Sequence, residues 1–169
     1  MNVFRLLRLL AVFYVLIVAQ TTLVGAVSVA GARPDLLMIA VLLIALHEGA
    51  AGGAMAGFVA GLFVDLNSVQ TLGVTSLANA FVGFAAGSVA DRLVRTSWVT
   101  RVVLVFAAAV VRDQVVAMLA MGGDFGGSLR FFFRSILVGG LYTALLAPIL
   151  MAVLERAIGW EREKSRGFR

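Results

Sequence analysis

Residues 49–65 read GAAGGAMAGFVAGLFVD, and this stretch decides how the chain can fold. A glycine stands at every fourth position, at Gly49, Gly53, Gly57 and Gly61, and Asp65 continues the series. Residues four apart share one face of a helix, so the glycines open a groove that another backbone can approach closely. Such faces hold helices together in lipid. The groove can serve packing within the chain or the docking of a transmembrane partner.

The whole chain has the composition of a membrane protein. Its 169 residues are 62% hydrophobic and 14% charged, against about 25% charged residues in ordinary soluble domains. Six apolar stretches approach the roughly 20 residues that a membrane-spanning helix needs; they are 6–27, 34–46, 50–66, 72–90, 102–121 and 135–154. We therefore predict an all-α polytopic membrane protein with six transmembrane helices.

The second stretch, 34–46, is short for a span. As a helix it covers only about 20 Å, so 34–46 and 50–66 form either two short spans or one bent or re-entrant element. Pro34 suits the first turn of a helix and Asp35 suits its capping; alternatively, both belong to an exposed partner site. His47 and Glu48 are expected in a solvated turn before Gly49.

The lysine and arginine residues predict the orientation in the membrane. With the N-terminus inside, ten of the fourteen lie on the cytoplasmic side, in agreement with the positive-inside rule. These ten are Arg5, Arg8, Arg92, Arg95, Arg101, Arg156, Arg162, Lys164, Arg166 and Arg169. Because further spans follow the first, we interpret it as a retained helix rather than a signal peptide. We predict a bacterial inner-membrane protein with both termini in the cytoplasm, one transmembrane domain at 1–154 and a basic cytoplasmic tail at 155–169.

Three consecutive polar residues, Arg112, Asp113 and Gln114, lie near the middle of the stretch 102–121. An unpaired charge there costs about 2.5–3.5 kcal/mol on an insertion scale, so these side chains need partners. Neighbours in a helix do not face one another. We expect Arg112 and Asp113 to reach different helices unless Arg112 bends toward its neighbour.

Counting residues along the spans places four polar side chains at one depth, about 10–13 Å below the outer face. These are Gln20, Asn79, Asp113 and Thr143, with Ser76 and Tyr142 nearby. We predict one buried polar layer in the outer half of the bundle. It either joins the helices by hydrogen bonds or lines a cavity that opens outward.

Catalytic chemistry is not expected. The chain has no cysteine and one histidine, and its nine acidic residues are scattered rather than set at metal-ligand spacing. No Gly-x-Ser-x-Gly turn is present. The net charge of +5 comes from arginines beside apolar spans, so we expect lipid phosphates as their partners and not nucleic acid. We predict no enzyme, no metal and no cofactor.

Several motifs resemble those of one known family. They are Arg-Pro-Asp-Leu-Leu at 33–37, Gly-Phe-Val-Ala-Gly-Leu-Phe-Val-Asp-Leu at 57–66, Leu-Gly-Val-Thr-Ser-Leu at 72–77 and Val-Gly-Phe-Ala-Ala-Gly at 82–87. With the chain length, the span count and the short basic tail, they resemble the rod shape-determining protein MreD family over most of the chain. The pair Arg112 and Asp113 is not part of that resemblance.

The resemblance implies a role in the bacterial cell-elongation complex (the elongasome) without catalysis. MreD proteins bind the bitopic protein MreC and help couple cytoplasmic MreB filaments to the peptidoglycan synthase formed by RodA and its transpeptidase. We expect the MreC contact on the glycine groove and around Asp35 and Asp65. The family is also similar in fold to the substrate-binding subunits of energy-coupling-factor transporters, so a vitamin-type carrier subunit is the alternative function.

Overall fold

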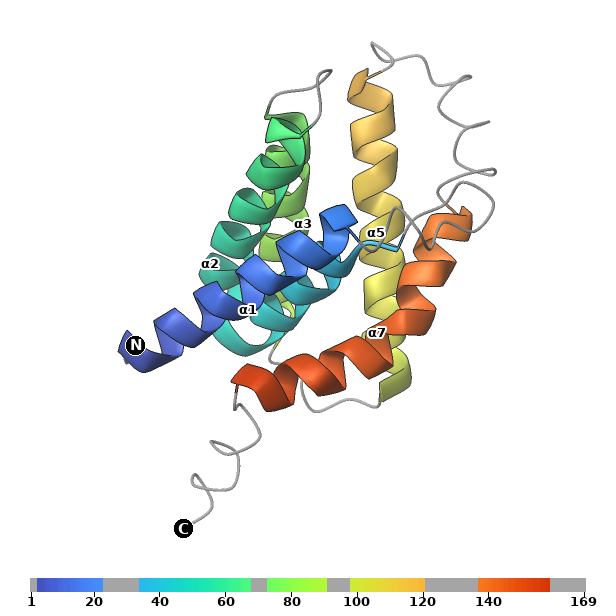
Figure 1. Cartoon of the computed structure of the whole chain (residues 1–169). Coiled ribbons are helices and arrows are strands. Elements are labelled where there is room, and N and C mark those ends of the chain that lie inside the picture. Colours follow the sequence, from blue (N-terminus) through green and yellow to red (C-terminus); the bar gives the residue numbers. More distant parts are fainter. Residues whose placement is uncertain (1–2, 23–33, 68–72, 91–97, 121–136, 159–169) are drawn as a thin grey trace.

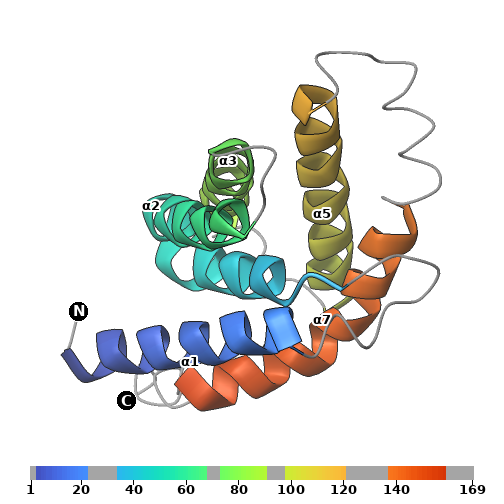
Figure 2. The ribbon, with the colours of Figure 1, turned by 45° about the horizontal axis from the view of Figure 1, so that its top comes forward.

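A computed structural model of the chain describes residues 3–22, 34–67, 73–90, 98–120 and 137–158, and these residues form α-helices joined to short turn or cap residues. Its helices are α1 (Val3–Thr22), α2 (Leu36–Leu66), α3 (Val74–Ser88), α5 (Trp98–Ala120) and α7 (Leu137–Ile158) (Figure 1). Turning the molecule shows α1 and α7 running side by side below the pair formed by α2 and α3 (Figure 2). Arg8 Nη1 donates to the carbonyl oxygen of Ile158 at 3.3 Å, which joins α1 to the end of α7.

Helix α2 bends back on itself at Gly49. This residue has φ 75° and ψ −165°, a conformation that glycine adopts without steric cost. A Cβ built on Gly53 would lie 2.6 Å from the Cβ of Ala45, eight residues earlier, whereas eight residues of straight helix rise about 12 Å. We name residues 36–48 the first arm of α2 and residues 50–66 the second arm.

The first arm forms the centre of the hydrophobic core. It is buried on every side, and Ile39, Val41 and Leu42 are 0% exposed. A helix that is apolar all round belongs in the interior of a bundle. Leu16 of α1 and Met151 of α7 belong to the same core cluster.

The second arm packs against α3 in antiparallel order along the glycine series. A Cβ built on Gly53 would lie 2.3 Å from the carbonyl oxygen of Gly83, and one built on Gly57 would lie 2.2 Å from that of Asn79. On Gly61 the added atom would lie 2.3 Å from the Cα of Ser76. The backbones touch where side chains would otherwise separate them, as in other glycine-spaced helix pairs.

The residues that the structure describes form five helices, so the predicted count of six spans is not confirmed. Three are long and apolar enough to cross a membrane, namely Leu36–Leu66, Val99–Leu119 and Gly139–Ile158, while Leu7–Thr22 and Val74–Ser88 are apolar but shorter. The predicted stretches 34–46 and 50–66 are one bent element, because the chain turns within α2. Residues 23–27, 72, 121 and 135–136 of the predicted spans lie outside the described residues. At its other end α7 continues past the predicted domain end at 154 to Ile158.

Candidate functional site

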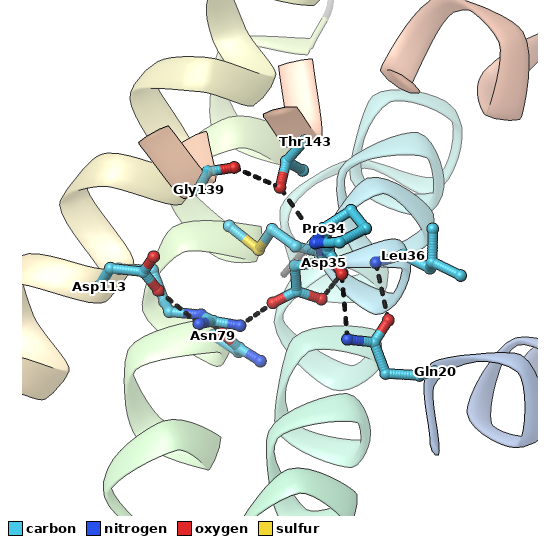
Figure 3. A network of polar contacts seen from close by, with 10 residues as sticks. Gln20, Pro34, Asp35, Leu36, Asn79, Asp113, Gly139 and Thr143 are labelled. Carbon is cyan, nitrogen blue, oxygen red and sulfur yellow. Dashed lines mark hydrogen bonds and ion pairs between the residues drawn. The ribbon is translucent and has the colours of Figure 1, made fainter. Parts of the chain in front are cut away.

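Polar side chains from four helices meet Asp35 where α2 begins. We name these residues the Asp35 network; they are Gln20 of α1, Asp35 before α2, Asn79 of α3, Arg112 and Asp113 of α5, and Thr143 of α7. Figure 3 shows Asp35 between Thr143, Gln20 and Asn79, with Asp113 on the far side of Asn79. One contact group thus ties every helix that the structure describes.

Asp35 uses its two carboxylate oxygens for two tasks. Its Oδ1 accepts a hydrogen bond from the backbone N–H of Met38 at 2.9 Å, which caps the first turn of α2. Its Oδ2 forms an ion pair with Nη2 of Arg112. The positive charge on α5 therefore holds the residue at which α2 begins.

Arg112 connects three helices. Besides the pair with Asp35, its Nε donates to Oδ1 of Asn79 at 3.0 Å and its Nη1 donates to Oδ1 of Asp113. The planar fork of a guanidinium can serve several acceptors at once. The side chains of Arg112 and Asp35 are 14% and 17% exposed, so the pair is largely shielded. Arg112 therefore bends toward Asp113, the second of the two arrangements that the sequence allowed, and also reaches α2 and α3.

Gln20 and Thr143 hold the chain immediately before the first arm. Gln20 donates through Nε2 to the carbonyl oxygen of Pro34 at 3.2 Å and accepts at Oε1 from the N–H of Leu36 at 2.9 Å. The hydroxyl of Thr143 accepts from the N–H of Asp35 at 3.1 Å and donates to the carbonyl oxygen of Gly139 at 2.9 Å (Figure 3). Backbone groups that precede a helix lack partners inside it, and here α1 and α7 supply them.

The network contains four residues that the sequence placed at one depth, which are Gln20, Asn79, Asp113 and Thr143. Asp35, expected only as a cap or as a partner contact, is at its centre. Gln114 follows Asp113 in the chain, and Tyr142 precedes Thr143. Both side chains are half-buried. Whether any of these residues takes part in function stays a prediction.

Asp65 joins the end of α2 to the beginning of α3. Gly73 precedes α3 with φ 92° and no capping side chain of its own. Asp65 caps it instead, accepting from the N–H groups of Gly73 at 3.0 Å, Thr75 at 3.2 Å and Ser76 at 2.9 Å, and from the Ser76 hydroxyl at 2.7 Å. The side chain is 0% exposed. A carboxylate also suits the positive end of a helix dipole.

The glycine groove is occupied within the chain. α3 lies against Gly53, Gly57 and Gly61, and Asp65 is enclosed between α2 and α3. The groove is thus filled by packing within the chain, which was one of its two predicted uses. Asp35 is likewise engaged by Arg112. Whether a partner also contacts the residues around Asp35 and Asp65 stays a prediction.

A second polar cluster was not foreseen. Arg101 of α5 and Glu155 of α7 form a buried ion pair of 2.9 Å, and His47 Nε2 lies 3.9 Å from the same carboxylate oxygen. The sequence placed His47 in a solvated turn and Glu155 at the start of the tail, whereas Glu155 is 7% exposed and His47 is half-buried. Arg101 and Glu155 are 54 positions apart, and the only signal for them was a lone acidic residue at the end of an apolar stretch near basic ones.

The described part of the chain has no group of three or more His, Asp and Glu side chains that could hold a metal ion. Comparison with curated proteins and with solved structures gives no significant match. The family model of the rod shape-determining protein MreD matches residues 1–157. That span includes the Asp35 network, the glycine groove and Glu155. On this match, the chain belongs to the rod shape-determining MreD family of proteins.

Proposed function

We propose that this protein is an integral-membrane scaffold of the bacterial elongation complex, which binds MreC and supports peptidoglycan synthesis and cell shape. Membership of the MreD family gives the role in rod-shape determination. The observation that carries the scaffold proposal is the internal use of polar groups: the Asp35 network, Asp65 and Glu155 each bond to other helices. Such contacts make a fixed platform for other membrane proteins.

The proposal places the protein in the inner membrane with both termini in the cytoplasm. Arg8, Arg101 and Glu155 lie at one end of the bundle, since Arg8 contacts the last residue of α7 and Arg101 contacts Glu155. His47, just before the bend in α2, lies at the same end. We name this the basic end, and the positive-inside rule assigns it to the cytoplasm. MreB would then be coupled through MreC, with RodA and its transpeptidase as further partners.

The vitamin-carrier alternative has less support. It needs the outer polar layer to line an open cavity. In the structure Asp35 instead bonds to Arg112 of α5 and, through its backbone N–H, to Thr143 of α7. The same contacts are what a scaffold requires. The partner surface then lies on apolar outer faces of the bundle, where side chains such as Leu10 and Met55 are 58% and 72% exposed.

Co-purification tests the proposal. The tagged protein and MreC are produced together, extracted in a mild detergent and purified through the tag, and bound proteins and small molecules are quantified by mass spectrometry. We expect MreC in near-equal amount, and only traces with an unrelated tagged membrane protein. MreC at the level of that control would refute the proposal, and a bound vitamin-sized molecule would favour the carrier.

A further inference from the structure

The pair formed by the second arm of α2 and by α3 is shorter than α5, which lies beside α3 (Figure 1). At about 1.5 Å per residue, residues 50–66 rise about 25 Å and Val74–Ser88 rise about 22 Å. The hydrocarbon core of a bilayer is about 30 Å thick. Neither of these helices reaches across such a core, and a tilt of either helix would shorten its reach further.

Contacts at the glycines hold the two helices of this pair level with each other. Near the start of α3, a Cβ built on Gly61 would lie 2.3 Å from the Cα of Ser76. Near its end, a Cβ built on Gly87 would lie 2.5 Å from the carbonyl carbon of Gly49. Because the backbones touch near both ends, the helices cannot slide past each other to form a longer unit.

Exposed polar side chains stand at both ends of the pair. Asn67 follows the second arm, and its Nδ2 donates to the carbonyl oxygen of Phe63 at 2.8 Å. Ser88 is the last residue of α3, and its hydroxyl donates to the carbonyl oxygen of Phe84 at 2.8 Å. Carbonyl groups in the last turn of a helix lack partners within it, and such groups are costly in lipid. We therefore expect both ends at the hydrated surface of the bilayer.

Large apolar side chains mark the faces that contact lipid. Along α3 and its cap, exposed side chains of this kind run from Leu77 to Val89, a rise of about 18 Å. Along α5 they run from Val99 to Leu119, a rise of about 30 Å. The apolar band on α5 therefore matches the thickness of an ordinary bilayer core, whereas the band on α3 is shorter.

We propose that the bilayer is thinner beside the pair of α2 and α3 than beside α5, so that one face of the protein fits a thinned lipid surface. A short span is accommodated by thinning of the bilayer, by flanking side chains that reach toward the headgroups, or by oligomerisation. The side chains of Asn67 and Ser88 are short and bond to their own helices, so they cannot extend the pair. The inference goes beyond the proposed scaffold function and does not depend on MreC.

Spin labels test the local thickness. The chain has no cysteine, so each introduced cysteine provides one attachment point. Leu77→Cys and Val89→Cys place labels on the pair, and Val103→Cys and Val115→Cys are the matched control on α5, because all four positions are exposed and both sets have the same separation in sequence. The full-length protein is reconstituted without partners in dioleoyl phosphatidylcholine, and its folding is checked by circular dichroism. Collisions of each label with a water-soluble nickel complex and with oxygen are measured by electron paramagnetic resonance.

We expect the nickel complex to reach the labels at positions 77 and 89 several-fold more often than those at 103 and 115, because the first two lie close to the edge of a thinned core. Tilt of α3 in a bilayer of uniform thickness would bury both labels more deeply, so it cannot produce this result. Equal shielding of all four labels from nickel would overturn the inference. Shielding of positions 77 and 89 from oxygen as well would also overturn it, since a second copy of the chain would then cover this face.

Two further measurements separate a thinned bilayer from a water-filled crevice. A label at Phe81, an exposed position between Leu77 and Val89, should stay as shielded from nickel as the labels on α5. Nickel contact at Phe81 equal to that at Leu77 would indicate a crevice and overturn the inference. In dimyristoleoyl phosphatidylcholine, whose core is thinner, the labels on α5 should become more accessible and the difference between the two helices should shrink. A difference that stays the same in both lipids would contradict the proposal.

Discussion

Asp35 and Arg112 are 77 positions apart and form an ion pair between the beginning of α2 and α5. The same carboxylate caps α2 through the N–H of Met38. A helix start and a contact between helices therefore depend on one side chain. Since Arg112 also holds Asn79 and Asp113, this pair connects α2, α3 and α5.

The Asp35→Asn variant keeps a side chain that can cap α2 and removes its negative charge. Asparagine caps helices about as well as aspartate, so α2 should begin at the same residue. Loss of the carboxylate leaves Arg112 with less compensation in a shielded position, and we expect a loss of stability on the order of 3 kcal/mol. Thermal unfolding in lipid nanodiscs, followed by circular dichroism, measures the effect.

The matched control is the double variant Asp35→Asn with Arg112→Gln. Because both partners of the pair are then neutral, its loss should be smaller than the sum of the two single losses, with a coupling of about 1–3 kcal/mol. Strict additivity would show that the two residues do not act on each other.

Gly57→Ala should destabilise the pair of helices formed by the second arm and α3. The new Cβ would lie 2.2 Å from the carbonyl oxygen of Asn79, and a backbone atom cannot move aside cheaply. We expect a loss of about 1–3 kcal/mol from overpacking. In Gly140→Ala the nearest atom is the Cγ2 of Val110 at 3.1 Å, so that control should lose much less. Equal losses in chemical unfolding would contradict the packing argument.

Local patterns were enough to predict an all-helical chain and close packing at the glycines. Apolar stretches indicated where helices form, and the four-residue glycine spacing of the second arm reappears in its antiparallel contact with α3. Counting residues along the predicted spans placed Gln20 and Thr143 at the same depth, because all α-helices that cross a membrane have the same rise per residue. These signals are contained in the sequence near each residue.

The pairings across long separations were not predictable in the same way. Asp35 already has a local role as a cap, so nothing in its surroundings pointed to Arg112. The length of the first arm held the missing clue. An arm of about 20 Å that turns at one face of a membrane core of about 30 Å begins below the opposite surface, which puts Asp35 inside the bundle. No comparable signal pointed to the ion pair of Arg101 with Glu155, because only the tertiary fold brings these two residues together.

Asp65→Ala should loosen the connection between α2 and α3. It removes the acceptor for three backbone N–H groups and the Ser76 hydroxyl, and buried donors without partners cost about 1–3 kcal/mol each. We expect faster hydrogen exchange at the Thr75 and Ser76 amides, measured by mass spectrometry. Asn67→Ala, which removes an exposed hydrogen bond to the Phe63 carbonyl, is the control and should leave those amides protected.

Arg101→Glu should strongly destabilise the basic end. It sets a second carboxylate beside Glu155 and removes a buried ion pair of 2.9 Å, so we expect a loss on the order of 3 kcal/mol in thermal unfolding. The exposed Arg156, next in the chain to Glu155, provides the comparison: Arg156→Glu should cost less than Arg101→Glu, because the Arg156 side chain stays in contact with solvent. The double variant Arg101→Glu with Glu155→Arg restores opposite charges and should recover most of the loss. Recovery should stop short of complete, because His47 lies 3.9 Å from the position of the Glu155 carboxylate and would then face a cation. If the double variant is no more stable than Arg101→Glu alone, the two residues do not hold α5 to α7 by charge.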